Sequence, residues 1–127
     1  MRVVDTNIVV RLIARDDPRQ VELAEAFIKG GAWVSTLVLQ ETLWVLERAY
    51  KVGRVPIARL VELLLDHESL VLEAPALVRV ALSEFRGSKN VGFSDCLVLA
   101  SARAQGHLPV GTFDKRLAKL ADTEVLR

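Results

Sequence analysis

The sequence predicts an α/β protein, a three-layer α/β/α sandwich around a central, mainly parallel sheet of about five strands. Two observations support this fold class. Short apolar runs of strand length alternate along the chain with longer segments whose apolar residues recur at helical spacing. Strands separated by helices pair in parallel, because each crossover helix returns the chain to the same end of the sheet, and the helices then cover both faces. Since 127 residues are one domain's worth, we expect a single domain over residues 1–127.

The first elements are separated by helix caps and breakers. Residues 3–4 predict a buried strand, which stops at Asp5-Thr6-Asn7, residue types that cap a helix. A short apolar helix follows over residues 8–14. Pro18 then opens a second helix that runs to residue 29, and residues 32–35 form the second strand.

A long helix is predicted over residues 36–50. It carries one apolar stripe, with Glu41 in its opening turns on another face. A turn separates it from a helix over residues 56–66, and residues 70–72 form the third strand. The residues of the apolar stripe are Leu39, Leu43, Leu46 and Tyr50.

The second half of the chain continues the alternation. A helix is predicted over residues 75–85, and a basic, polar loop follows over residues 86–90. Ser94 is a suitable cap for a helix over residues 95–105. The last predicted elements are a strand over residues 110–112, a helix over residues 115–121 and an edge strand over residues 124–126.

Charge and hydropathy limit the classes of partner. The 17 basic and 16 acidic residues give a net charge of +1, so no overall field attracts a polyanion, and nucleic-acid binding would depend on a local patch. The chain is 51% hydrophobic with a mean hydropathy of +0.29, which is more apolar surface than a small domain easily buries. We therefore expect a homodimer or another partner interface.

The sequence predicts a cytoplasmic protein without membrane contact. No apolar region of signal-peptide length follows Met1, and no apolar run approaches the ~20 residues that a bilayer crossing requires. The single cysteine, Cys96, excludes an internal disulfide, which fits a reducing compartment.

Four acidic residues stand where the chain leaves a predicted strand or enters a predicted helix. Asp5, Glu41 and Asp114 follow strands, and Asp95 opens a helix. In a doubly wound sheet such positions can converge on the crevice at the carboxyl ends of the strands, and helix N-termini favour carboxylates. Structural alternatives stay open, because Asp5 and Asp114 can cap helices and Glu41 can be a solvated first-turn acid. Asp95 has the weakest structural explanation, since it shares a helical stripe with core residues and carboxylates rarely face a core unpaired.

The acids predict a metal-dependent reaction. Four carboxylates in one crevice would repel one another unless a cation intervened. The ligand set is all oxygen, with no His or Cys at a matching junction, which favours Mg²⁺ or Mn²⁺ over zinc. Such an ion activates water and stabilises charge on a phosphodiester, so the predicted reaction is phosphoryl hydrolysis.

Four motifs carry these acids in a recognisable order. They are Val4-Asp5-Thr6-Asn7, Gln40-Glu41, Phe93-Ser94-Asp95-Cys96 and Thr112-Phe113-Asp114-Lys115. Their order and separation resemble the acidic signatures of PIN-domain ribonucleases, and the match is closest to the VapC-like toxins of prokaryotic toxin–antitoxin pairs. The resemblance runs from Val3 to about Val125 and includes Asp16-Asp17-Pro18 and Trp44-Val45-Leu46. One departure is Gly92, where many relatives carry a further acid, which leaves the strength and number of metal sites open.

The resemblance implies a PIN-like fold and a Mg²⁺- or Mn²⁺-dependent endoribonuclease that prefers single strands. Asn7 and Thr112 are implied to orient the acids, the water or the scissile phosphate, although both residue types are also common at such junctions for structural reasons. The implied partner is a small VapB-like antitoxin, whose C-terminal segment lies in an apolar groove and places a basic side chain among the acids. The residues implied to hold the metal and activate water are Asp5, Glu41, Asp95 and Asp114.

Other residues have a functional and a structural interpretation. Cys96 lacks an evident His partner and fits a small buried residue better than a nucleophile. The rings of Trp33, Trp44 and Tyr50 fall in apolar stretches, so we expect them in the core or in an interface rather than as base-stacking platforms. Cations near the last two acids are candidate contacts for RNA phosphates, although solvated surface charge explains each one more simply. These cations are Arg86, Lys89, Lys115 and Arg116.

Two rival functions stay open. An Asp-nucleophile phosphatase also begins with a strand that ends in Asp, but it requires a second acid two residues on, where this chain has Asn7. A catalytically silent PIN-fold binding module would use the acidic crevice to hold a basic peptide. The complete set of four acids weighs against that alternative.

Overall fold

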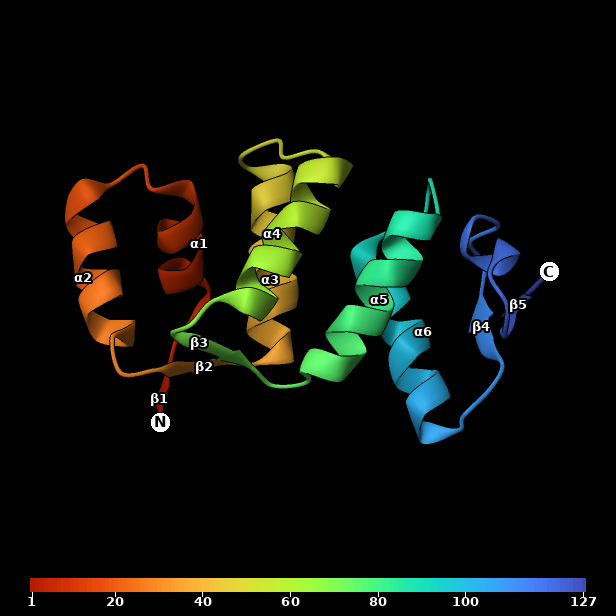
Figure 1. The fold of residues 1–127 in the computed structure, drawn as a ribbon. Helices are drawn as coiled ribbons and strands as arrows, with labels where there is room; N and C mark the ends of the chain where they lie inside the picture. The colour runs from red at the N-terminus through yellow and green to blue at the C-terminus, as the bar shows by residue number, and fades with distance from the viewer. The chain divides into compact units, whose positions relative to one another are not determined.

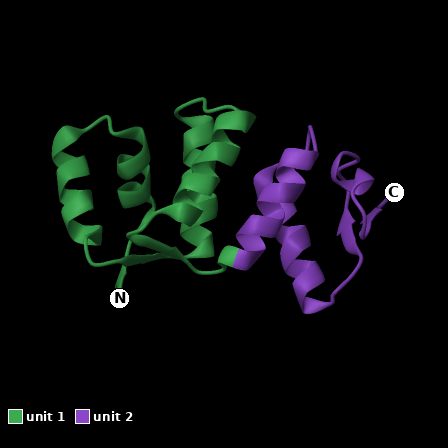
Figure 2. Cartoon of the chain, viewed as in Figure 1, with its two compact units in different colours: residues 1–75 green, residues 76–127 purple.

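The computed structural model describes residues 1–127, which form two compact units. Unit 1 is Met1–Pro75 and unit 2 is Ala76–Arg127 (Figure 2). Each unit has its own helices and its own parallel β-sheet. The predicted α/β class and the predicted alternation of strands and helices are confirmed.

Unit 1 contains three strands and four helices (Figure 1). They are β1 (Arg2–Val3), α1 (Thr6–Ala14), α2 (Pro18–Ile28), β2 (Ala32–Val34), α3 (Thr36–Arg48), α4 (Arg54–Asp66) and β3 (Leu70–Leu72). The strand order is β1-β2-β3 and both pairings are parallel, with Arg2 beside Ala32 and Ala32 beside Leu70. Helix α1 packs against both α2 and α3. This packing places the start of α1, where the first strand ends, next to α3.

Unit 2 contains two α-helices, one short 3₁₀ helix and a two-stranded parallel sheet (Figure 1). They are α5 (Pro75–Gly87), α6 (Phe93–Gln105), β4 (Val110–Thr112), the 3₁₀ helix η1 (Leu117–Lys119) and β5 (Thr123–Val125). Strand β4 pairs with β5, with Val110 beside Thr123. None of the helices in either unit has both the length and the hydrophobicity to cross a membrane.

The core of unit 1 is built from the apolar stripes of its helices. Helix α3 buries Leu39, Leu43 and Leu46, none of which is more than 3% exposed. Helix α4 buries Ile57 and Val61 completely. Because these residues recur at helical spacing, each helix turns one face inward and leaves the opposite face to solvent.

Unit 2 buries its own apolar residues at the start of α6. The rings of Phe85 and Phe93 pack edge to face, with 5.7 Å between their centroids. Cys96 and Leu99 are buried one and two turns further along α6. The expectation that Cys96 is a small buried residue is confirmed.

Polar side chains cap three helices of unit 1. The side chains of Asp5, Asp17 and Ser35 each accept the backbone N–H three residues ahead, at 3.1, 3.0 and 3.0 Å. Such caps satisfy amide groups that have no partner inside the helix. Asp5 therefore does cap α1, and this structural role leaves one of its two carboxylate oxygens available to a ligand.

The first strand is less buried than predicted. Val4 is 1% exposed, but Val3 is 58% exposed. Strand β1 is the edge strand of its sheet, and successive side chains of a strand point to opposite faces. The prediction of two buried valines is therefore wrong for Val3.

The strand count is lower than predicted. Hydrogen bonds join three strands in unit 1 and two strands in unit 2. The larger sheet thus has fewer strands than the predicted sheet of about five.

Two predicted helix features are wrong. Only η1 forms within the helix predicted over residues 115–121, because the backbone is extended at Leu120 and Asp122 has a φ of 66°. Contacts from Asp114 and from α6, described below, hold this segment out of helical geometry. The helix predicted to begin after Ser94 begins at Phe93, with Gly92 at the N-cap position, so Ser94 lies within its first turn.

Two of the aromatic side chains lie outside the core, which leaves an interface as the predicted location. Trp44 is 58% exposed and Tyr50 is 37% exposed, so the core is the wrong location for both. The Tyr50 hydroxyl donates to Asp16 at 2.9 Å, and Arg11 donates to the same carboxylate at 2.9 Å. These hydrogen bonds lower the pKa of Asp16, the one from Tyr50 most strongly, and they tie the turn after α1 to the end of α3.

Candidate functional site

The four predicted acids lie in two pairs, one in each unit. Asp5 and Glu41 form the unit 1 pair, and Asp95 and Asp114 form the unit 2 pair. Neither unit alone gathers three or more His, Cys, Asp or Glu side chains that could hold a metal ion.

A buried threonine joins the unit 1 pair. Asp5 caps α1 at the end of β1, and Glu41 lies in the second turn of α3. The hydroxyl of Thr6, a residue only 9% exposed, donates a hydrogen bond to Glu41 Oε1. A donor to a carboxylate favours its charged form and restricts its rotamers. The structure thereby brings Glu41 beside the residue that follows Asp5.

Thr6 is a site residue that the sequence-based prediction missed. It is the middle residue of the Asp-Thr-Asn motif, but only its two neighbours were assigned a role. The available signal was its position at the start of the helix, two residues after the apolar Val4, where a hydroxyl that becomes buried needs a partner.

A pocket lies between α1 and α2 beside the unit 1 pair. Its volume is about 370 Å³, and it combines the polar side chains of Asp5 and Asn7 with the apolar side chains of Leu23 and Phe27. Asn7 and Asp5 therefore line the same pocket. The other lining residues are Ile8, Arg11, Gln20 and Ala24.

Asp114 in the unit 2 pair is held by three groups. Thr112 ends β4, and its hydroxyl accepts the Asp114 backbone N–H at 3.0 Å. The Arg116 guanidinium donates to both carboxylate oxygens of Asp114, each at 3.2 Å, and the Arg116 backbone N–H donates at 2.8 Å. These donors, the guanidinium first, hold the pKa of Asp114 below its ordinary value.

Asp95 interacts with the same guanidinium. It lies in the first turn of α6, where the helix dipole favours a negative charge. Asp114 chiefly, and Asp95 in addition, raise the pKa of Arg116. Arg116 is therefore ion-paired with Asp114 and also feels the charge of Asp95.

Contrary to the prediction, the side chain of Asp95 is not turned into the core. It is half-buried, and Val98 on the same stripe is 50% exposed, whereas Leu99 is buried. The stripe thus runs along the border of the buried face, and the Asp95 carboxylate is accessible to solvent. This removes the expected desolvation cost of the carboxylate.

The predicted cations fall into different environments. Arg86 lies in the last turn of α5, and Lys115 is exposed beside Asp114. A pocket of about 300 Å³ brings Lys89 and Arg116 together with Lys119, which the sequence-based prediction missed. Arg116 forms an ion pair with Asp114, and its side chain is 64% exposed, so it is both a solvated cation and a partner of this acid.

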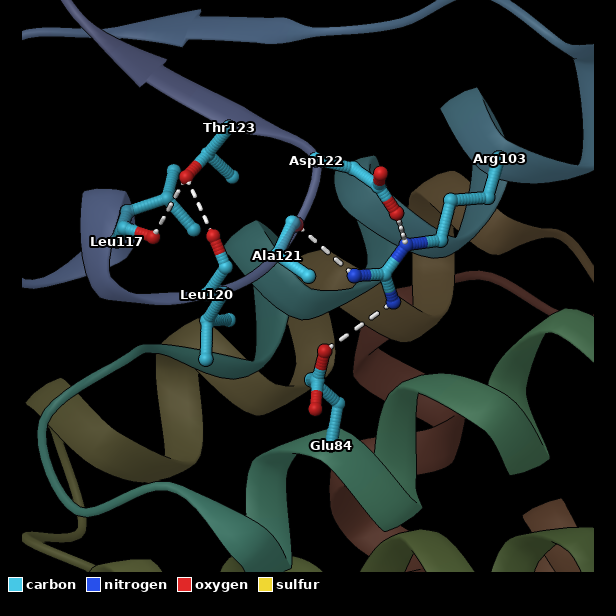
Figure 3. A network of polar contacts seen from close by, with 7 residues as sticks. All are labelled: Glu84, Arg103, Leu117, Leu120, Ala121, Asp122 and Thr123. Carbon is cyan, nitrogen blue, oxygen red and sulfur yellow. Dashed lines mark hydrogen bonds and ion pairs between the residues drawn. The ribbon is translucent and has the colours of Figure 1, made fainter.

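Arg103 fixes the segment that follows Asp114 (Figure 3). From α6 it donates to the Asp122 carboxylate at 2.8 Å and to the Ala121 carbonyl at 2.9 Å. A third hydrogen bond of 3.2 Å reaches Glu84 on α5. This fork links both helices of unit 2 to the chain between η1 and β5, and it explains why no regular helix forms there.

Replacing Arg116 by alanine is expected to raise the pKa of Asp114 part of the way to its ordinary value. The guanidinium is the largest cause of the lowered pKa, and the backbone donors remain in the variant. The pKa of Asp114 in the folded state lies below its pKa in the unfolded state. The contact with Arg116 therefore stabilises the fold at pH values above the unfolded-state pKa. This stabilisation is lost as the pH falls through the folded-state pKa. An NMR titration of the Asp114 carboxyl group measures the change. A Lys115→Ala variant is the control, and an equal shift in both variants would contradict the assignment.

Two comparisons with known proteins agree with each other. Residues 2–123 match the family model described as PIN domain. The chain is also 31% identical over 127 residues to a VapC ribonuclease from Aquifex aeolicus (strain VF5), an alignment that covers 94% of this chain and 92% of that protein. The family match therefore extends over both units, and the positions of all four acids lie within the matched range.

Proposed function

Since the chain belongs to the PIN-domain family, we propose that it is a Mg²⁺- or Mn²⁺-dependent endoribonuclease and the toxin of a toxin–antitoxin module. The observation that carries this proposal is the pairing of the four acids within the units. The hydroxyl of Thr6, directly after Asp5, donates to Glu41, and Arg116 forms an ion pair with Asp114 while the charge of Asp95 also acts on it. Solvent-accessible carboxylates are the oxygen ligands that a hard divalent cation prefers.

The donor chemistry fits a hard divalent cation. We propose Asp5, Glu41, Asp95 and Asp114 as the residues that hold it. When bound, the ion supplies Lewis acidity and lowers the pKa of a water molecule that attacks the phosphodiester. The Thr6 hydroxyl orients Glu41, and the Thr112 hydroxyl orients the backbone of Asp114.

The remaining polar residues have supporting roles in this proposal. Asn7 orients the acids, the water or the scissile phosphate from its position beside Asp5. Lys89 and Lys119 contact RNA phosphates at the basic pocket of unit 2, and Arg86 and Lys115 add positive charge to that unit. Arg116 neutralises Asp114 until a metal ion or a substrate phosphate replaces that contact.

We propose that residues 1–127 act as one nuclease domain. The family match begins in unit 1 and ends in unit 2, and each unit contributes two of the four acids. The proposed partners are a VapB-like antitoxin and a second copy of the chain in a homodimer, and the proposed location is the cytoplasm. The apolar side of the pocket between α1 and α2, formed by Leu23 and Phe27 beside Asp5, supports an antitoxin segment as ligand.

An RNA cleavage assay tests the proposed function. The purified protein is incubated with single-stranded and with fully paired RNA in Mg²⁺, in Mn²⁺ or in EDTA. Cleavage of the single strand with either metal, and its loss in EDTA, is the expected result. Cleavage that persists in EDTA, or none with any metal, would reject the mechanism.

The same assay separates the two rival functions. A silent module for basic peptides would leave RNA intact in every buffer, although the Arg116 contact to Asp114 illustrates how such a peptide could bind. A phosphatase would form a phospho-aspartate at Asp5, and Asn7 in place of the required second acid argues against it.

A further inference from the structure

Helix α3 exposes an indole on the face opposite its core stripe. At about 100° per residue, positions 37, 41, 44 and 48 share one face, and the buried residues Leu39, Leu43 and Leu46 occupy the other. Trp44 on that outer face is 58% exposed. A side chain with so large an apolar ring is usually buried for most of its area, so a ring left in water is a candidate contact for a ligand.

A cation accompanies the ring. The Arg48 guanidinium lies over the Trp44 indole, with 5.4 Å from its central carbon to the ring centroid. Arg48 is one helical turn beyond Trp44 and is itself exposed. An exposed aromatic ring beside a cation is the combination that binds single-stranded nucleic acid, because bases stack on the ring and the cation meets the phosphates.

The indole is also close to a proposed catalytic acid. Trp44 follows Glu41 by three positions in α3, a spacing that puts their Cβ atoms about 5–6 Å apart. A nucleotide neighbouring a phosphate held at Glu41 is therefore within reach of the Trp44 ring.

We propose that Trp44 and Arg48 form a nucleotide-binding subsite, in which the indole stacks on an unpaired base next to the scissile phosphate and Arg48 contacts the backbone. This inference rests on the proposed nuclease function and specifies its substrate class. Because a base inside a duplex cannot offer its face to the ring, the subsite selects single-stranded over paired RNA. The positive charge of Arg48 over the ring favours RNA over an apolar protein surface as the occupant.

The chain contains two tryptophans, Trp33 and Trp44, which permits a direct binding test. A Trp33→Phe variant keeps Trp44 as its single indole, and a Trp44→Phe variant keeps Trp33, which is half-buried in β2. Each variant is titrated in EDTA with a short single-stranded oligoribonucleotide and, separately, with a paired one. We expect the single strand to quench the emission of Trp44 but not that of Trp33. Equal quenching in both variants, or none in either, would overturn the proposal.

Affinity measurements identify the contribution of each side chain. Trp44→Ala is expected to weaken binding of the single strand by roughly tenfold, with part of the affinity retained in Trp44→Phe. Arg48→Ala is expected to lower by about one the number of counterions released on binding, which is measured from the salt dependence of the RNA affinity. Leu63→Ala is the matched control, because Leu63 is 60% exposed on α4 and is not expected to affect RNA binding. An unchanged RNA affinity in Trp44→Ala, together with a change in its sedimentation behaviour, would assign the surface to a protein partner instead.

Cleavage assays separate this inference from the proposed function. The rates of cleavage of single-stranded RNA by the wild-type protein and by Trp44→Ala are compared at an RNA concentration below saturation. If both proteins cleave at the same rate, the nuclease function stands and the subsite is rejected. If the wild-type protein cleaves nothing but the single strand still quenches Trp44, the nuclease function is rejected and the binding surface stands.

Discussion

An Asp5→Asn variant is expected to lose RNA cleavage while keeping its fold. Asparagine retains the side-chain oxygen that accepts the Ile8 N–H at 3.1 Å, so the cap of α1 is preserved. It removes the negative charge with which Asp5 is proposed to hold the metal. Second-shell partners of metal sites already affect activity by about 10- to 100-fold, so loss of a ligand should lower the cleavage rate by at least about 100-fold.

Asp17→Asn is the matched control for this experiment. Asp17 caps α2 with the same geometry, accepting the Gln20 N–H at 3.0 Å, but it is not one of the proposed metal ligands. Both variants should therefore unfold at the same urea concentration as the wild type, and only Asp5→Asn should lose activity. If Asp5→Asn cleaves RNA as fast as Asp17→Asn does, Asp5 is only a helix cap and the proposed metal site is wrong.

Local patterns were sufficient to predict most of the elements. The strands over residues 70–72 and 110–112 were predicted with the observed bounds, because Leu70-Val71-Leu72 is a short apolar run between polar residues and Pro109 stands directly before Val110. Helix α2 begins at Pro18 as predicted, since Asp17 and Pro18 together specify a helix start. These boundaries depend only on neighbouring residues, so the sequence contains the required information.

The wrong predictions concern contacts between residues distant in sequence. The segment 115–121 has helix-forming residues, but Arg103 in α6 binds Ala121 and Asp122 and holds the chain in another path. No local pattern reveals such a contact. By contrast, the exposure of Trp44 was predictable, because it follows Leu39 by five positions and so lies away from the buried stripe of α3.

In the candidate site, too, local patterns were sufficient for some residues, and contacts between distant residues decided the others. The four acids could be identified from the order of their motifs, and they stay predictions as metal ligands. Their immediate partners could not be identified in this way. The Thr6 hydroxyl reaches Glu41 only because α1 packs against α3, and Lys119 joins Lys89 only because the chain turns at η1.

A Thr6→Val variant is expected to lower RNA cleavage about 10- to 100-fold, because valine keeps the shape of threonine and removes the donor that orients Glu41. The free energy of unfolding should fall by about 1 kcal/mol, the value of one hydrogen bond to an accessible acceptor. Cleavage rates and urea unfolding curves measure the two effects separately. A smaller loss of activity in Thr6→Ser, which retains the hydroxyl, would identify the donor rather than the methyl group as the cause.

Thr42→Val is the control for Thr6→Val, because it removes a threonine hydroxyl that makes no hydrogen bond. Thr42 follows Glu41 in α3, is fully buried, and has a hydroxyl without any hydrogen-bond partner. Replacing that hydroxyl by a methyl group removes an unpaired polar atom from the core, so the variant should be as stable as the wild type or more stable by about 1 kcal/mol. Its cleavage rate should be unchanged, because Thr42 makes no contact with the carboxylate of Glu41. If Thr6→Val and Thr42→Val changed activity and stability alike, the hydrogen bond from Thr6 to Glu41 would have no special role in cleavage.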